Sequence, residues 1–163
     1  MHHPVQDRTA AALHWRHEAD CAAFAARLAA LPGLRNAFIE LRGELGAGKT
    51  TFARHLLRAL GVGGRVKSPT YAVLEPYRTP DGLAVSHLDF YRFNDPREWQ
   101  DAGLRDVFAA PGLKLAEWPE KAAAMLPVPD LALCIEVQAG CSRAVTLRAS
   151  TALGGRLLAE LGT

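Results

Sequence analysis

The sequence lacks a long apolar run. No stretch of about 18 consecutive apolar residues occurs in the 163-residue chain, and a helix that crosses a lipid bilayer needs roughly that length. Residues 1–12 also lack the apolar segment of a secretory signal peptide. We therefore expect a cytoplasmic protein with no membrane partner. The composition, 49% hydrophobic and 22% charged, is ordinary for a globular protein, and the length predicts a single domain over residues 1–163.

Cysteine and clustered positive charge are both scarce. The three cysteines, Cys21, Cys134 and Cys141, form no C-x-x-C pair, which argues against a disulfide framework and against a zinc site. The 19 lysines and arginines are spread along the chain, and the net charge is only +2. A protein that binds nucleic acid unaided normally presents a clustered basic face. We therefore expect no DNA partner, and at most a weak direct contact with RNA.

Hydrophobic periodicity predicts alternating strands and helices. The turn at 79–82 (TPDG) between two apolar segments predicts an antiparallel hairpin, and Gly154 and Gly155 are expected to interrupt the last helix early. The fold class is therefore α/β, with a mixed, mostly parallel sheet, an antiparallel hairpin and helices on both faces. Strands are expected at 11–16, 37–42, 71–78, 83–90, 113–118, 131–138 and 143–148, and helices at 18–31, 49–60, 95–102, 119–126 and 153–161.

One glycine-rich segment carries a strong chemical signal. Residues 43–50 read GELGAGKT, which matches the phosphate-loop pattern G-x-x-x-x-G-K-[ST], with a strand expected before it and a helix after it. Glycines let consecutive backbone N–H groups converge on phosphate oxygens. The Lys49 charge would reach the β- and γ-phosphates, and the Thr50 hydroxyl would bind Mg²⁺. The residues expected to bind the nucleotide here are Glu44, Leu45, Gly46, Ala47, Gly48, Lys49, Thr50 and Thr51.

Magnesium also needs a carboxylate, which usually comes from the end of a neighbouring strand. Asp89 and Glu117 each follow an apolar strand segment and are both candidates. Ser68 and Thr70 lie in the segment after the phosphate-loop helix, where some NTPases carry a threonine that senses the γ-phosphate. The alternative for this segment is a proline turn with a hydroxyl cap. These patterns predict a P-loop NTPase fold that binds a nucleoside triphosphate and Mg²⁺.

Three classes of P-loop protein compete as explanations of these features. A GTPase is disfavoured because the sequence has neither D-x-x-G nor N-K-x-D. A small-molecule kinase is the main alternative, although an arginine-dense lid is absent and a hairpin follows the phosphate-loop helix. The third class is an NTPase that acts on a protein partner. A nucleotide-sensing module without turnover also stays open.

Four motifs together resemble the bacterial TsaE (YjeE) family, the ATPase component of tRNA threonylcarbamoyladenosine synthesis. They are GELGAGKTTF at 43–52, VKSPTYAVLEPY at 66–77, HLDFYRF at 87–93 and EWPE at 117–120. The first is generic, whereas S-P-T-[YF], H-x-D-x-Y-R and E-W-P in this order are specific. The resemblance implies an ATPase that assists TsaB and TsaD in forming N6-threonylcarbamoyladenosine at position 37 of tRNAs reading codons that begin with A. Contact with tRNA would then be indirect, through the partners.

The resemblance also implies roles for individual residues. Many relatives carry a threonine near the nucleotide where this chain has Asp20, so the adenine end of the site stays open. The catalytic residues would be Lys49, Asp89 and Glu117, the Mg²⁺ ligands Thr50, Asp89 and Glu117, and the additional ATP-binding residues Ser68, Thr70 and Trp118.

Overall fold

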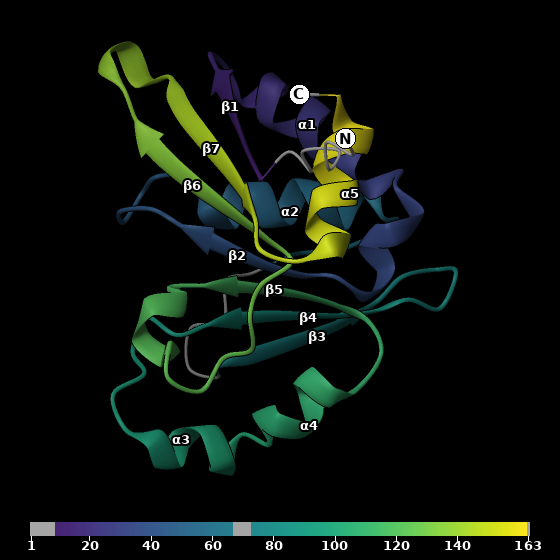
Figure 1. The fold of residues 1–163 in the computed structure, drawn as a ribbon, viewed down its shortest axis with the longest axis vertical. Coiled ribbons are helices and arrows are strands. Elements are labelled where there is room, and N and C mark those ends of the chain that lie inside the picture. Colours follow the sequence, from purple (N-terminus) through teal and green to yellow (C-terminus); the bar gives the residue numbers. More distant parts are fainter. Residues whose placement is uncertain (1–8, 67–72, 163) are drawn as a thin grey trace, which may run out of the picture.

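A seven-stranded sheet forms the centre of the computed structural model, which describes residues 9–66 and 73–162. The strand order is β1-β7-β6-β2-β5-β4-β3 (Figure 1). The four central strands β6, β2, β5 and β4 run parallel, and antiparallel pairs flank them at both edges. This confirms the predicted mixed sheet and its hairpin. The strands are β1 (Ala10–Trp15), β2 (Phe38–Arg42), β3 (Leu74–Arg78), β4 (Ala84–Asp89), β5 (Leu113–Glu117), β6 (Leu131–Val137) and β7 (Arg143–Ala149).

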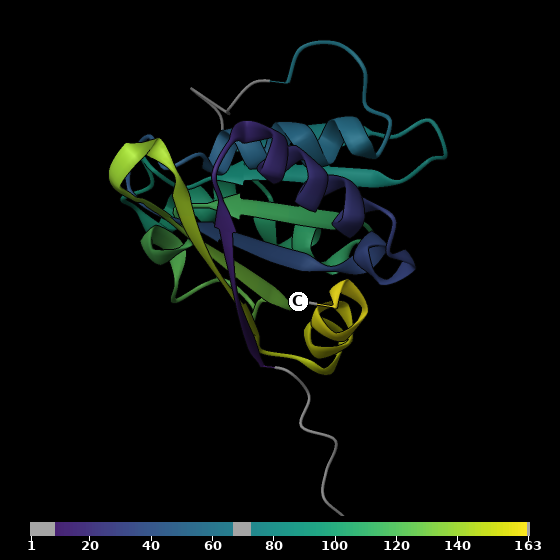
Figure 2. The ribbon, with the colours of Figure 1, turned by 90° about the horizontal axis from the view of Figure 1, so that it is seen from above.

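Helices cover both faces of the sheet. The first face carries α1 (Glu18–Ala29), α2 (Lys49–Ala59) and α5 (Ala152–Leu161), and the second carries α3 (Pro96–Asp101) and α4 (Leu104–Ala109) (Figures 1 and 2). Three 3-10 segments complete the described elements: η1 (Pro32–Asn36), η2 (Pro119–Ala122) and η3 (Ala139–Cys141). Within residues 9–66 and 73–162, every helix is too short or too polar to cross a membrane.

Alternation along the central strands builds two hydrophobic cores. Ile39 and Leu41 of β2 are buried beneath α1, α2 and α5. Phe38, on the other face of the same strand, packs against Phe108 of α4 with ring centroids 4.9 Å apart. Strand side chains alternate between faces, so β2 is buried on both sides. Its carboxyl end, where the phosphate loop begins, is therefore held between two packed layers.

Three local predictions differ from the structure. Helix α4 was not predicted, because six residues after a left-handed Gly103 are too few for a helical period. The helix predicted at 119–126 is only the 3-10 segment η2. Pro127 disfavours helical backbone at Leu126, so it limits how far a helix could extend here. Helix α5 is not interrupted at its glycines. A Cβ at Gly154 would lie 1.7 Å from the Asp130 carbonyl oxygen, so glycine permits close packing there.

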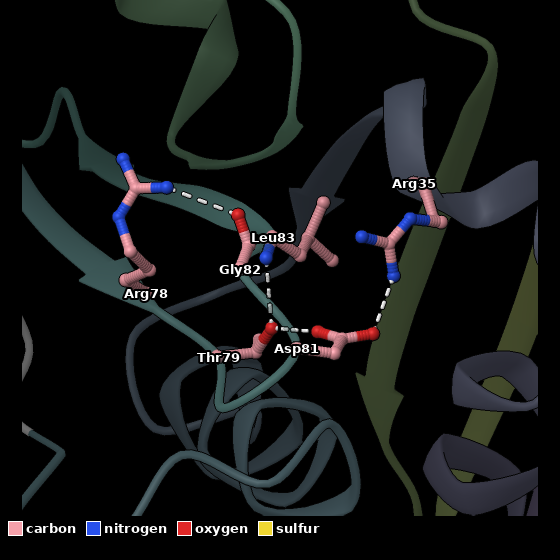
Figure 3. Close-up of polar contacts among 6 residues, drawn as sticks. All are labelled: Arg35, Arg78, Thr79, Asp81, Gly82 and Leu83. Atoms are coloured by element: carbon pink, nitrogen blue, oxygen red, sulfur yellow. Dashed lines mark hydrogen bonds and ion pairs between the residues drawn. The ribbon is translucent and has the colours of Figure 1, made fainter.

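The hairpin between β3 and β4 is fixed by side chains in its turn (Figure 3). Thr79, which is buried, donates its hydroxyl hydrogen to the Asp81 carboxylate and accepts the Leu83 amide at 3.0 Å. Asp81 also pairs with Arg35 of η1 at 2.7 Å. The Thr79 hydroxyl, followed by Arg35, holds the pKa of Asp81 below its ordinary value of 3.8. These contacts tie the hairpin to the first face of the sheet.

Replacing Thr79 by valine is expected to lower the free energy of unfolding by about 1–3 kcal/mol. Valine preserves the shape but leaves the Leu83 amide without its hydroxyl acceptor. Urea denaturation at neutral pH measures the loss. Thr79→Ser is the control, because it keeps the hydroxyl. A Thr79→Val protein as stable as wild type would contradict this interpretation of the turn.

The hairpin also makes stability depend on pH. Because the pKa of Asp81 is lowered in the folded state, the stabilisation that Asp81 contributes is present above pH 3.8 and is lost as pH falls through the folded pKa.

Candidate nucleotide site

The phosphate loop joins the carboxyl end of β2 to the first residue of α2. Gly43, Gly46 and Gly48 all have positive φ, at 151°, 80° and 113°. A Cβ at Gly43 would lie 2.5 Å from the Ile135 carbonyl oxygen, so a side chain is excluded there on steric grounds as well. The strand, loop and helix are arranged as the sequence predicted. This arrangement directs the free N–H groups at the start of α2 into the hollow of the loop.

Lys49 lies at the base of this loop with only 4% of its surface exposed. Its ammonium group donates to the Gly43 carbonyl and sits 3.5 Å from the ring centroid of Trp118. Burial lowers the pKa of Lys49, while the nearby carboxylates, Glu117 first, oppose the shift. An aromatic face stabilises a cation that has left bulk water. The loop thus contains a largely desolvated positive charge, suited to an anionic ligand.

The two predicted carboxylates end neighbouring parallel strands. Asp89 is the last residue of β4 and Glu117 the last of β5, and the two are partners in the ladder. Glu117 is 2% exposed and accepts the Thr50 hydroxyl at 2.9 Å on Oε1 and 3.1 Å on Oε2. Asp89 Oδ1 accepts the amide of Tyr91 at 2.9 Å. Strand register therefore brings both carboxylates beside the first turn of α2.

Most of the predicted site residues line a single cavity of about 250 Å³. Tyr91 also lines it, with its ring 5.0 Å from that of Trp118. Tyr91 was not predicted as a site residue, although it lies within the motif HLDFYRF. Trp118 has a left-handed backbone with φ of 55°, an uncommon conformation for a bulky residue, and this turns the chain directly after Glu117. The predicted residues that line the cavity are Leu45, Gly46, Ala47, Gly48, Lys49, Thr50, Thr51, Asp89, Glu117 and Trp118.

Three predicted site residues remain. Ser68 and Thr70 lie outside the described residues. Glu44 belongs to the loop without lining this cavity, and its carbonyl accepts the Ala47 amide at 3.0 Å.

The oxygen donors in the cavity suit a magnesium ion. Thr50 supplies a hydroxyl, and Asp89 and Glu117 supply carboxylates. Among the described residues, no group of three or more histidine, cysteine, aspartate or glutamate side chains could hold a metal ion. Mg²⁺ in nucleotide sites is typically held by one or two carboxylates together with phosphate oxygens and water. The donor set therefore fits Mg²⁺ bound jointly with a phosphate ligand, and it lacks the nitrogen and sulfur ligands of a zinc site.

A second cavity of about 250 Å³ lies on the other side of the phosphate loop. Ala47, Gly48 and Thr51 line both cavities. The residues that form its remaining walls were not predicted, because they come from segments far apart in the chain. They are Trp15, Arg16, His17, Glu18 and Cys21 from the β1–α1 region, and Cys141 and Arg143 from the β6–β7 hairpin.

Arg143 connects the tip of the β6–β7 hairpin to the phosphate loop. Its Nε donates to the Ala47 carbonyl at 2.7 Å, and its Nη1 donates to the carbonyls of Cys141 and Ser142. A guanidinium group has five N–H donors in a fixed plane. Arg143 therefore holds the phosphate loop through its Nε–H. Its other guanidinium N–H donors lie at the wall of the second cavity.

Replacing Arg143 by leucine is expected to weaken nucleotide binding about tenfold, with ADP as the probe, because the loop loses a charge-assisted hydrogen bond. Isothermal titration calorimetry measures the change. Arg148→Leu is the matched control, since Arg148 lies exposed on the same strand. Equal ADP affinity in the two variants would show that the Arg143 contact does not shape the loop.

Comparison with known proteins identifies the family of this chain. The family profile described as threonylcarbamoyl adenosine biosynthesis protein TsaE matches residues 15–145. The TsaE protein of Haemophilus influenzae is 40% identical over 120 residues, covering 74% of this chain and 75% of the relative. Bacillus subtilis TsaE is 37% identical over 119 residues, covering 72% and 71%. The crystal structure of Bacillus subtilis YdiB superposes with a TM-score of 0.79 at 27% identity, covering 94% of each chain. The chain belongs to the TsaE family of threonylcarbamoyl adenosine biosynthesis proteins.

Proposed function

We propose that this protein is a Mg²⁺-dependent ATPase that assists TsaB and TsaD in forming N6-threonylcarbamoyladenosine at position 37 of tRNAs reading codons that begin with A. It would act in the cytoplasm and contact tRNA through these partners. The observation that carries the proposal is the convergence of Lys49, Thr50, Asp89 and Glu117 on one cavity at the phosphate loop. The family relationship supplies the pathway.

The two cavities suggest how ATP would lie. The phosphates would occupy the cavity that contains Lys49, where a buried cation and helix N–H groups favour anions. The nucleoside would pass Ala47 and Gly48 into the second cavity, which Arg16 and His17 help to line. In this proposal the adenine, whose binding residues the sequence left open, would lie next to the start of α1.

These residues would promote hydrolysis mainly by electrostatic stabilisation of the phosphate oxygens. Mg²⁺, held by Thr50 and the carboxylates Asp89 and Glu117, would neutralise charge on the β- and γ-phosphates when bound. Lys49 would stabilise the same oxygens as negative charge moves toward the leaving group. The carboxylates would also orient the attacking water. Ser68 and Thr70 would contact the γ-phosphate, and Trp118 would pack beside it.

Hydrolysis by the protein alone should be slow and should rise when partners are present. Among the described residues, Arg143 contacts the loop, but its guanidinium group is already bonded to Ala47 and to the hairpin tip. A group that stabilises the transferring phosphoryl would therefore come from a partner, as it does in other P-loop enzymes. We propose that hydrolysis resets the TsaB–TsaD assembly between turnovers.

Multiple-turnover tRNA modification tests the proposed role. Purified TsaB and TsaD, with tRNA and the threonylcarbamoyl donor, should modify more than one tRNA per complex only when this protein and ATP are added. Failure to bind these partners or to support repeated rounds would contradict the proposal. A phosphorylated metabolite detected by mass spectrometry would instead favour a small-molecule kinase. Nucleotide binding without any hydrolysis in the complete mixture would favour a sensing module.

A further inference from the structure

His87 is a buried polar residue beside the nucleotide cavity to which the site described above gives no role. It lies on β4, two residues before Asp89, and is 0% exposed. Residues two apart on a strand share a face, so His87 points toward α2, as Asp89 does. On the neighbouring strand, its partner in the ladder is Leu115, two residues before Glu117. Register therefore brings the imidazole alongside the Glu117 carboxylate.

The contact between these two side chains is short and enclosed. His87 Nε2 lies 2.6 Å from Glu117 Oε2, and the two side chains are 0% and 3% exposed. His87 Nδ1 is buried and has no hydrogen-bond partner among residues 9–66 and 73–162. An ionised carboxylate only accepts hydrogen bonds, so the imidazole hydrogen belongs on Nε2. Within the described part of the chain, the one polar interaction of this imidazole is thus directed at Glu117.

Glu117 is consequently held from two sides. Thr50 donates its hydroxyl to both carboxylate oxygens, and His87 donates to Oε2. A hydroxyl can donate its hydrogen to a carboxylate while its oxygen lone pairs bind a cation. The Thr50 contact is therefore compatible with a magnesium ion at Thr50. The His87 contact comes from the interior of the sheet, and it limits rotation of the carboxylate about its terminal torsion.

We propose that His87 is a positioning residue, which orients the Glu117 carboxylate toward the metal and the phosphates through its Nε2–H. The inference rests on the proposed nucleotide site but concerns a residue that does not line its cavity. A buried imidazole with an unpartnered nitrogen costs stability, and a leucine would fill similar space without that cost. A role for its Nε2 in orienting Glu117 would explain why a histidine occupies this position.

Three substitutions separate positioning from packing. His87→Leu fills the space without a donor. His87→Gln keeps an amide N–H close to the Nε2 position, whereas His87→Asn has a shorter side chain whose amide falls near the Nδ1 position. His14→Leu is the matched control, because His14 is an exposed histidine on β1 that contacts Ser142. The comparison of Gln with Asn keeps the test decisive if the leucine variant does not fold.

Two measurements test the proposal. Calorimetry in Mg²⁺ and in EDTA gives the ADP affinity, and steady-state assays with TsaB and TsaD give kcat and KM for ATP hydrolysis. His87→Leu and His87→Asn should lose the gain in ADP affinity that Mg²⁺ gives wild type and should lower kcat about tenfold. Affinity in EDTA and KM should stay near wild type. His87→Gln should recover most of both properties, and His14→Leu should match wild type.

Two results would overturn the positioning role. One is unchanged Mg²⁺ dependence and kcat in His87→Leu and His87→Asn. The other is equal loss of ADP affinity with and without Mg²⁺, including in His87→Gln, which would indicate a packing role alone. The calorimetry needs no partner protein, so it distinguishes failure of this inference from failure of the proposed ATPase function. In the latter case wild type itself would hydrolyse no ATP with TsaB and TsaD.

Discussion

Lys49→Ala is expected to reduce ATP hydrolysis in the presence of TsaB and TsaD by at least about a hundredfold. The substitution removes a buried cation that lies at the base of the phosphate loop. In a desolvated site a full charge stabilises phosphate oxygens far more than it would in water. The loss should appear both in kcat and in the affinity for ATP, because in the proposed site the same ammonium group would meet the β- and γ-phosphates in the ground and transition states. Steady-state phosphate release and calorimetry measure the two effects.

The matched control for this prediction is Lys121→Ala. Lys121 is an exposed lysine of η2 close in sequence to Trp118, and its removal should leave both constants unchanged. Lys49→Arg should also fail to rescue the activity, because a planar guanidinium fork does not replace a compact ammonium charge in an enclosed loop. Wild-type hydrolysis by a folded Lys49→Ala protein would remove the phosphate loop from the mechanism.

Glu117→Gln is expected to lower kcat by about a hundredfold or more and to raise the Mg²⁺ concentration needed for half-maximal activity. Glutamine keeps the shape of the side chain and can still accept the Thr50 hydroxyl. It removes the negative charge that a hard cation requires. ADP binding in EDTA should be nearly unchanged, since the phosphate loop itself is intact. Hydrolysis measured over a series of Mg²⁺ concentrations tests both effects together.

Glu120→Gln provides the corresponding control. Glu120 is a half-exposed carboxylate three residues further on, 4.0 Å from Arg42, and its charge is screened by solvent. Its substitution should leave the Mg²⁺ dependence as in wild type. If Glu117→Gln retained wild-type kcat and Mg²⁺ dependence, the assignment of Glu117 as a metal ligand would be wrong.

The sequence predicted the parts of the site that depend on local patterns. The glycines of the phosphate loop require positive φ over a few residues, so a short motif identifies them. Asp89 and Glu117 are the last residues of parallel strands. Parallel strands end at one edge of a sheet, which made their convergence predictable without coordinates. The short helix α3 was also predictable, because Asp95 caps it by accepting the Arg97 amide.

Features that depend on distant contacts were not predictable in the same way. Arg143 reaches Ala47 across 96 positions of sequence, and no local pattern marks it. The hydrogen bond from His87 to Glu117 depends on the register of β4 against β5. A shift by one residue would turn His87 to the other face of the sheet. The second cavity likewise needs the β1–α1 region and the β6–β7 hairpin to meet beside the loop. These contacts follow from packing, which one sequence does not determine by pattern alone.

The rate of ATP hydrolysis with and without the TsaB–TsaD complex tests the proposed function most directly. We expect slow hydrolysis by the protein alone and a rate at least about tenfold higher with the complex, as expected when a partner completes a phosphoryl-transfer site. The increase should require Mg²⁺ and disappear in Lys49→Ala. An identical rate with and without the complex, under conditions where the partners form N6-threonylcarbamoyladenosine, would contradict an ATPase that works through TsaB and TsaD.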